Sequence, residues 1–375
     1  MQLDLTVAGG ALAEAAARIS RLLPARTLQP ALAAVLVTAD PAAGEVVLAG
    51  SDGEQSAAVR VPAAVHGAGA VAVSRRGLAE TLAGLDSPEV RLVAEGSRLA
   101  VRLPGARFAL PRLEEAALPP PAGPPPVVGT VEGGALRAAV VPVASAASRE
   151  HALPIFTAVR VRSGQGALRV VATDRFRMAA AALPWRPAAG GAGVDTLLPA
   201  ALFAEVARQV GRAGEVTVHA DADRFGLAWD GGHAVTSSLG TPFPDQQIDR
   251  LLSVRPECAV EVAAGDLAGA VDRAAPYAGP HGRIALHVGD GAIVVRGSDP
   301  LAGESEEAVK ASVRGDHVTR AYQARYLLDA LRPFAGRTVR VEVQAGLLAT
   351  LLCAAGEDEV ALRYLVVPMR TEDAR

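Results

Sequence analysis

The sequence is almost without lysine, has few aromatic residues and carries only two cysteines. Lys310 is the single lysine, so arginine supplies nearly all of the positive charge. Aromatic residues make up 3% of the chain, which argues against a protein that binds single strands by stacking bases on aromatic rings. Cys258 and Cys353 are too few and too far apart for a disulfide framework or a zinc site. We expect two reduced thiols in a cytosolic protein.

The chain also lacks a strong net charge and a long apolar run. Its formal charge is −3, so the overall field does not attract a polyanion, and any DNA contact must come from a local basic surface or from topology. Residues 1–5 lack the basic start of a signal peptide, and no apolar run reaches membrane-spanning length. Half of the residues are apolar, enough for several cores. We expect a soluble, cytoplasmic protein without a membrane partner.

The residue patterns of catalysis are absent as well. The single lysine lies in A-V-K-A at 308–311, not in a phosphate-binding loop. The glycine-rich stretch at 67–72 leads into a strand-like segment, not a helix, and 49–53 resembles a nucleophile elbow but lacks its first glycine. The seven histidines are scattered, and no acidic residues pair for acid/base chemistry. We expect no enzyme, no metal and no cofactor; a hydrolase or transferase with an unrecognised site is the alternative.

One pattern occurs three times along the chain. A strand, a glycine turn and an amphipathic helix open at 7–12, at 131–136 and at 262–267. The leucines at positions 12, 136 and 267 place the copies 124 and 131 residues apart. Apolar residues then recur at helical spacing, as at 12, 15, 16 and 19, which marks one buried stripe. The spacing predicts three similar units.

Two further features repeat with nearly the same period. A strand-like run ends in a hydroxyl residue and an aspartate at 51–52, 173–174 and 298–299, and a second helix is expected near Leu78, Leu202 and Tyr326. Each unit is therefore predicted to be α+β, a sheet with two helices. The predicted domains are 1–118, 127–252 and 257–375. We expect the proline-rich segment 118–126 to be an extended linker, with a shorter joint at 253–256.

Four short strings resemble the bacterial DNA sliding clamp family, the beta subunit of DNA polymerase III. These are A-T-D-R-F-R-M-A at 172–179, Y-L-V-V-P-M-R at 364–370, F-P-D at 243–245 and P-I-F-T-A at 154–158. The resemblance runs along the whole chain and keeps the order of all parts. It implies a non-catalytic, head-to-tail dimeric ring of six domains that encircles double-stranded DNA.

The resemblance also implies an interface between two copies of the chain. Basic residues in the first domain would face acidic residues in the third, and apolar residues would meet beside them. Without the family, the same residues would be ordinary surface and core. The expected interface residues are Arg75, Arg76, Phe108, Leu110, Pro276, Tyr277, Glu304, Glu306 and Glu307.

A clamp needs basic residues that touch phosphates without reading bases. Arginines spaced three or four apart share a helix face, and others align with loop positions that face DNA in the family. Each could equally be an exposed helix arginine. The expected DNA-binding residues are Arg18, Arg21, Arg26, Arg137, Arg149, Arg208, Arg212 and Arg273. The family's basic pair at the second-domain helix is replaced by Ala200 and Ala201, which suggests a looser grip.

Clamps recruit the polymerase III alpha subunit, the clamp loader and other proteins through a short, partly apolar peptide. The matching positions combine aliphatic and thioether side chains with an arginine rim, although Met178 and Leu365 could simply be core. The expected pocket residues are Ile155, Thr173, Arg175, Phe176, Arg177, Met178, Pro244, Leu365, Val367, Pro368, Met369 and Arg370.

The segment after Pro244 departs from the family. The family continues with an aromatic, a basic pair and an aliphatic proline stretch, whereas residues 246–252 read Q-Q-I-D-R-L-L. This change, the low lysine content and the lost basic pair favour an alternative within the family. In that alternative the chain is an auxiliary clamp that tolerates a clamp-directed antibiotic or serves a restricted set of partners.

Overall fold

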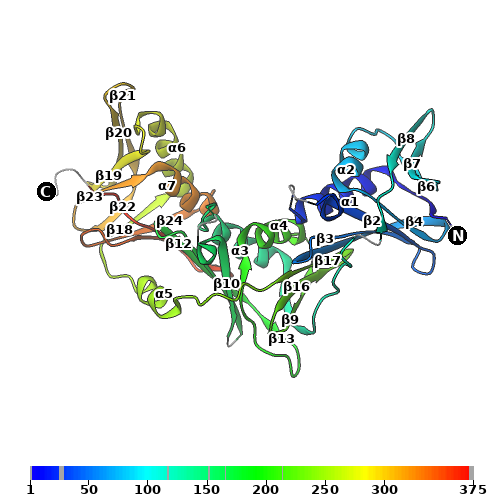
Figure 1. Cartoon of the computed structure of the whole chain (residues 1–375). Coiled ribbons are helices and arrows are strands. Elements are labelled where there is room, and N and C mark those ends of the chain that lie inside the picture. Colours follow the sequence, from blue (N-terminus) through cyan, green and yellow to red (C-terminus); the bar gives the residue numbers. More distant parts are fainter. Residues whose placement is uncertain are drawn as a thin grey trace. The chain divides into compact units, whose positions relative to one another are not determined.

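The computed structural model describes residues 2–24, 29–115, 118–150, 153–164, 166–212 and 214–370 (Figure 1). Its contacts form two compact units. The first unit contains Met1–Gly133, Pro187–Ala192 and Arg208–Ser238; the second contains Gly134–Arg186, Gly193–Ala207 and Leu239–Arg375. No helix in the described ranges is long and apolar enough to cross a membrane.

The first unit is built on a 13-stranded sheet that runs from the first predicted domain into the second. The first domain supplies β1 (Asp4–Ala8), β2 (Ala34–Asp40), β3 (Glu45–Ser51), β4 (Gln55–Gly67), β5 (Gly69–Ser74), β6 (Glu89–Glu95), β7 (Arg98–Leu103) and β8 (Ala106–Pro111). The second domain supplies β9 (Val127–Glu132), β13 (Arg186–Pro187), β15 (Glu215–Ala220), β16 (Arg224–Trp229) and β17 (Gly232–Ser237). The two groups join where β17 pairs antiparallel with β4.

The second unit contains a 9-stranded and a 4-stranded sheet. The larger sheet has β14 (Asp195–Pro199), β10 (Ala158–Ser163), β11 (Ala167–Thr173), β12 (Arg177–Pro184), β26 (Ala361–Val366), β25 (Thr350–Ala354), β24 (Thr338–Gln344), β18 (Pro256–Ala263) and β22 (Ser312–Gly315) in spatial order. The smaller has β21 (Gly303–Lys310), β20 (Ala292–Asp299), β19 (Arg283–Gly289) and β23 (Val318–Gln323). Antiparallel pairing of β12 with β26 joins the second and third domains.

The helices keep the predicted period. The first helix of each domain is α1 (Gly9–Leu22), α3 (Gly133–Ser145) or α6 (Ala264–Ala274), and the second is α2 (Arg75–Ala83), α4 (Ala200–Val210) or α7 (Ala324–Leu331). The second helices begin two or three residues before the expected positions. Within their domains α1 packs on α2, and α6 packs on α7. The α+β class with two helices per domain is confirmed.

The leucines that set the period lie in the cores. Leu12, Leu136 and Leu267 are each buried, as are Ala15, Ala16 and Ile19 on the same stripe of α1. The glycine turn before α1 has a steric reason, because a Cβ at Gly9 would lie 2.2 Å from the carbonyl oxygen of Ser87. A side chain at that position would force the start of α1 away from the segment that leads into β6.

The repeated aspartates close hairpin turns. Asp52 Oδ1 accepts hydrogen bonds from the backbone N–H groups of residues 54 and 55, Asp174 Oδ1 from those of 176 and 177, and Asp299 Oδ1 from those of 301 and 302. An aspartate that bonds to the backbone two and three residues on stabilises a tight turn. The nucleophile-elbow-like string at 49–53 is therefore one of three equivalent turns.

Two connections complete the chain. No helix or strand covers 118–126. In this segment the carbonyl of Ala122 accepts a hydrogen bond from Ser56 Oγ, and the carbonyl of Pro126 accepts one from the backbone N–H of Ala220. The joint between the second and third domains contains a helix that the sequence did not predict, α5 (Asp245–Leu252). Short 3-10 helices lie at Pro30–Ala33, Pro154–Thr157, Ala275–Tyr277 and Arg332–Phe334.

Candidate functional site

The turn between β11 and β12 forms the centre of the candidate site. Its Arg175 has a φ of 79°, a left-handed conformation that is unfavourable for a residue with a side chain. The turn holds it there: Thr173 Oγ1 accepts from the N–H of Arg175 at 3.2 Å and donates to the carbonyl of Arg177 at 2.8 Å. The strained turn projects Phe176 outward, where its side chain is 53% exposed.

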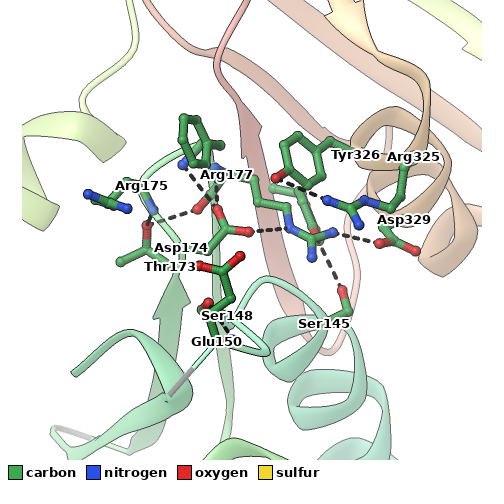
Figure 2. A network of polar contacts seen from close by, with 12 residues as sticks. Ser145, Ser148, Glu150, Thr173, Asp174, Arg175, Arg177, Arg325, Tyr326 and Asp329 are labelled. Atoms are coloured by element: carbon green, nitrogen blue, oxygen red, sulfur yellow. Dashed lines mark hydrogen bonds and ion pairs between the residues drawn. The ribbon is translucent and has the colours of Figure 1, made fainter. Parts of the chain in front are cut away.

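Arg177 ties this turn to the third domain (Figure 2). Its buried guanidinium lies 3.0 Å from Asp174 Oδ2 and 2.6 Å from Asp329 Oδ2, on α7, and 4.6 Å from the ring centre of Tyr326. Burial disfavours the charged form, but Tyr364 and the two carboxylates outweigh burial and raise the pKa of Arg177. One guanidinium therefore stays charged and links both domains.

Tyr364 closes the inner side of this network. Its hydroxyl lies 3.2 Å from Ser145 Oγ and 3.5 Å from Arg177 Nη1. Burial raises the pKa of Tyr364 to about 12, so the phenol is neutral at physiological pH. It acts as a hydrogen-bonding core residue between β26 and α3.

An exposed aromatic surface lies above the network. Phe176 stacks on Tyr326 with ring centres 6.3 Å apart, and the guanidinium of Arg175 lies 5.5 Å from the ring centre of Phe156. Val367 donates its N–H to the carbonyl of Phe176 at 2.9 Å and is 37% exposed. We call Phe176, Tyr326, Val367 and Arg175 the open end of the site. It offers apolar and cation–π contacts to a partner.

A second part of the site is aliphatic and closed. Met178 and Leu365, which pair across β12 and β26, are buried in one cluster with Leu351 and with Ile248 of α5. Phe243, Leu252, Val254 and Ala349 pack around it. We call the cluster of Met178, Ile248, Leu351 and Leu365 the closed end.

The predicted pocket residues lie on four separate segments of the second unit, and contacts join Met178 to Leu365 and Phe176 to Val367. Thr173, Arg175, Phe176 and Val367 lie at the open end, and Ile155 adjoins Phe156 in the 3-10 helix beneath Arg175. In the remaining set, Met178, Leu365 and Pro368 are buried, Pro244 and Met369 are half-buried, Arg177 belongs to the ion-pair network and Arg370 is exposed. Burial fits the core interpretation for Met178 and Leu365.

Several residues of the site were not found from the sequence. In the sequence, Tyr326 marks only the start of a helix, and Tyr364 is only part of the terminal string. Asp329 and Ile248 gave no signal, because their roles depend on contacts with residues more than 60 positions away. The hydroxyl and aspartate at 173–174 were the one local clue to the turn that organises the site.

The predicted DNA-binding arginines differ in their surroundings. Arg18 is half-buried and pairs with Glu14 at 2.5 Å, and Arg273 pairs with Glu307 at 2.6 Å. Arg26 lies outside the described residues. The exposed members are Arg21, Arg137, Arg149, Arg208, Arg212 and Arg273.

The predicted interface residues lie on two sheet edges and their neighbours. Arg75 is buried and donates to the carbonyl of Pro24, whereas Arg76 is exposed; only Arg76 presents its charge at the surface. Phe108 on β8 is 42% exposed. In the remaining set, Pro276, Glu304 and Glu306 are exposed and Leu110, Tyr277 and Glu307 are half-buried.

Within the described ranges, no group of three or more histidine, cysteine, aspartate or glutamate residues is placed to hold a metal ion.

Comparison with known protein families covers nearly the whole chain. The family models for the N-terminal, central and C-terminal domains of the DNA polymerase III beta subunit match residues 3–120, 130–245 and 250–370. The chain is 28% identical to the beta sliding clamp of Streptomyces coelicolor, covering 96% of this chain and 97% of that protein. It is 34% identical to that of Micrococcus luteus over 72% of this chain and 86% of that protein.

A third relative and two solved structures extend the comparison. The beta sliding clamp homolog GriR of Streptomyces muensis is 26% identical, covering 96% of this chain and 97% of that protein. The DNA polymerase III beta subunit of Thermotoga maritima superposes with a TM-score of 0.87 at 19% identity, covering 98% of this chain and 100% of that one. A Pseudomonas aeruginosa sliding clamp bound to griselimycin superposes with a TM-score of 0.87 at 21% identity. The match covers 99% of this chain and 100% of that one.

The buried ion pairs of Arg177 should stabilise the protein far more than a similar exposed pair. Arg177→Met removes the guanidinium partner of Asp174 and leaves Asp329 only the exposed Arg332, at 3.3 Å. We therefore expect the free energy of unfolding to fall by about 3–5 kcal/mol. Arg224 makes the same turn contact with Asp221, at 2.8 Å, but is exposed. Arg224→Met should cost no more than about 1 kcal/mol. Urea denaturation followed by circular dichroism measures both; equal losses would contradict the role given to Arg177.

Proposed function

Because the chain belongs to the DNA polymerase III beta subunit family, the bacterial sliding clamps, we propose that two copies of it close into a ring around duplex DNA. The family is a non-catalytic processivity factor, so the protein serves DNA replication by holding other proteins on DNA. The observation that carries the proposal is the series of three clamp domains, each joined to the next by strand pairing.

The strand joints support closure into a ring. At the first joint, β4, which follows the turn at Asp52, pairs with β17, the last strand of the second domain. At the second joint, β12, which follows the turn at Asp174, pairs with β26, the last strand of the third domain. The corresponding strands still at sheet edges are β21, which follows the turn at Asp299, and β8, the last strand of the first domain.

A partner copy would satisfy both edges. Pairing β21 of one copy with β8 of the next repeats the internal joints, and such a head-to-tail contact closes after two copies if the rotation permits. Their surroundings are complementary: Glu304 on β21 is exposed, and exposed Arg76 lies on α2, which packs beside β8. Phe108 supplies an exposed apolar side chain on β8.

DNA contact would come from the exposed arginines of the first helices and their neighbours. Arg21 lies near the end of α1, Arg137 near the start of α3 and Arg208 near the end of α4, so helices of the first and second domains carry exposed positive charge. Contacts of this kind touch phosphates and allow sliding. Arg273 is partly neutralised by Glu307, which lowers its share of the attraction.

Partner proteins would dock at the open end of the site. Exposed Phe176 and Val367, with Arg175 beside them, suit a short peptide that carries a leucine and an aromatic residue. We expect the polymerase III alpha subunit, the clamp loader and other clamp-binding proteins to use this surface.

A second role within the family is an auxiliary clamp that tolerates a clamp-directed antibiotic. Two observations favour it: the segment after Pro244 forms α5 and packs into the closed end, and one relative is the clamp homolog GriR. Counting clamp genes in the source genome and deleting this one discriminates between the roles, since only a single essential copy fits the housekeeping clamp.

The first test is oligomeric state. Light scattering at micromolar concentration should give about twice the 38.2 kDa of one chain. Phe108→Asp should shift the protein to monomers, because it places a charge in the apolar edge contact. Leu347→Asp, at an exposed turn residue, should leave the dimer intact. A monomeric wild-type protein would contradict the ring.

The second test is topological retention on DNA. Loaded protein should stay on nicked circular DNA and leave once that DNA is linearised, because the ring and not the affinity holds it. Combined Arg137→Glu and Arg212→Glu should shorten the retention time and flatten its salt dependence by about one phosphate contact per arginine. Combined Arg98→Glu and Arg169→Glu, at exposed positions of β7 and β11, is the matched control. Equal retention on circular and linear DNA would indicate an ordinary DNA-binding protein.

The third test addresses the docking surface. Val367→Glu should weaken binding of a short leucine- and phenylalanine-containing clamp peptide by at least about tenfold, because a charge replaces an exposed apolar contact. The change should not unfold the protein, since Val367 lies outside the core. Val127→Glu, an exposed apolar residue on β9, is the control for titration calorimetry. Unchanged affinity in Val367→Glu would place the docking surface elsewhere.

A further inference from the structure

α5 is the part of the site that the sequence left unexplained. It spans Asp245–Leu252, directly after Pro244 (Figure 1). Its Ile248 is buried and Leu252 is half-buried in the same apolar contact, whereas Gln246, Gln247 and Asp249 are exposed. One apolar stripe with polar residues on the other side is typical of a helix that packs on a surface.

The surface beneath α5 is the closed end of the site. Ile248 is 6% exposed and packs in one cluster with Met178 and Leu365, which are 3% and 2% exposed. Both of these side chains were predicted to receive partner peptides, yet the chain's own isoleucine is packed in their cluster. An incoming aliphatic side chain at this position must displace Ile248.

A charged contact holds the first turn of α5 against the sheet. Asp245 Oδ2 lies 3.2 Å from Arg160 Nη2 and 3.5 Å from Arg162 Nη1, both on β10. Asp195, at the start of β14, pairs with the same two arginines. Arg160 is largely buried, at 14% side-chain exposure, so its contact with Asp245 is screened less than an ion pair in open solvent.

Asp245 both pairs with Arg160 and begins the helix α5. As the first residue of α5 it lies at the positive end of the helix dipole. Burial lowers the pKa of Arg160, but the hydrogen bonds that it donates to Asp245 and Asp195 outweigh burial and raise it. The contact is thus a stable charged latch between α5 and β10.

We propose that α5 is a cover over the closed end of the partner-peptide site, and that Asp245 latches this cover to Arg160 and Arg162. The inference rests on the proposed function, in which partners dock at this site. A peptide with one aromatic or branched anchor binds at the open end without moving α5. A peptide with a second bulky aliphatic anchor binds fully only when the latch opens, so α5 selects among partners.

The cover lowers the apparent affinity for such two-anchor peptides. When only a fraction of the molecules have an open site, the apparent affinity for the peptide equals the intrinsic affinity multiplied by that fraction. Partly exposed ion pairs contribute modest energies, so removing the latch should tighten two-anchor binding by about three- to tenfold. A one-anchor peptide should bind equally with and without the latch.

The experiment uses the full-length protein and two uncharged decapeptides, each labelled with a fluorescent dye that is itself uncharged. One carries a leucine and a phenylalanine four positions apart, and the other has alanine in place of the leucine. Asp245→Asn removes the charge but keeps a residue that can cap a helix. Asp249→Asn makes the same chemical change at an exposed position of α5. Fluorescence anisotropy gives the affinities, and circular dichroism and light scattering verify fold and mass.

Asp245→Asn should bind the two-anchor peptide about three- to tenfold more tightly than wild type, and Asp249→Asn should match wild type. About 0.5 M salt should tighten wild-type binding and leave Asp245→Asn unchanged, since salt screens the contact of Asp245 with Arg162, whose side chains are 34% and 49% exposed. If Asp245→Asn binds as wild type does, the latch is wrong while the peptide site stands.

Ile248→Ala decides whether Ile248 covers the site or lines it. If Ile248 is a cover, Ile248→Ala should bind the two-anchor peptide more tightly, because the shorter side chain makes room for it. Leu251→Ala, at a residue that is 51% exposed, is the control and should bind as wild type does. Weaker binding in Ile248→Ala would mean that the isoleucine contacts the peptide as a wall, and would overturn the inference. Absence of binding by either peptide to every variant would overturn the docking site itself, and the cover with it.

Discussion

Unpaired sheet edges are the constraint on which the architecture depends. Each domain has an edge strand whose backbone groups need partners, and in the described chain two of these edges are satisfied by the following domain, at β4 with β17 and at β12 with β26. The pairing explains why contacts divide the middle domain between two units. It also leaves two complementary edges open: β21, the counterpart of β4 and β12, and β8, the counterpart of β17 and β26.

The joint between β12 and β26 also builds the candidate site. Because Met178 pairs with Leu365 and Arg177 with Val366, residues almost 190 positions apart become neighbours by register alone. The turn at Asp174 then directs Phe176 outward and Arg177 inward, where two carboxylates hold the guanidinium. Strand pairing, the ion-pair network and the exposed aromatic surface are therefore parts of one local structure.

The two ends of the site differ in how they meet a partner. The open end is preformed and exposed, so it can provide a first contact at little reorganisation cost. The closed end is covered by α5 with Ile248, so its use depends on the contact between Asp245 and β10. A clamp that must serve several partners can distinguish them by such a difference, since peptides vary in how many anchors they carry.

The sequence alone determined the three repeats, the α+β class, the positions of six helices within two or three residues and the turn aspartates, because period and turn chemistry are local properties. It also identified the segments of the site through their resemblance to a family. Tertiary structure alone decided that Arg177 pairs with Asp329, that Arg75 is buried, that Met178 and Leu365 are core, and that residues 245–252 fold back as a helix. Those outcomes depend on residues that are distant in the chain. Folding brings these residues into contact, and only then are the burial and the charge pairing of each side chain determined.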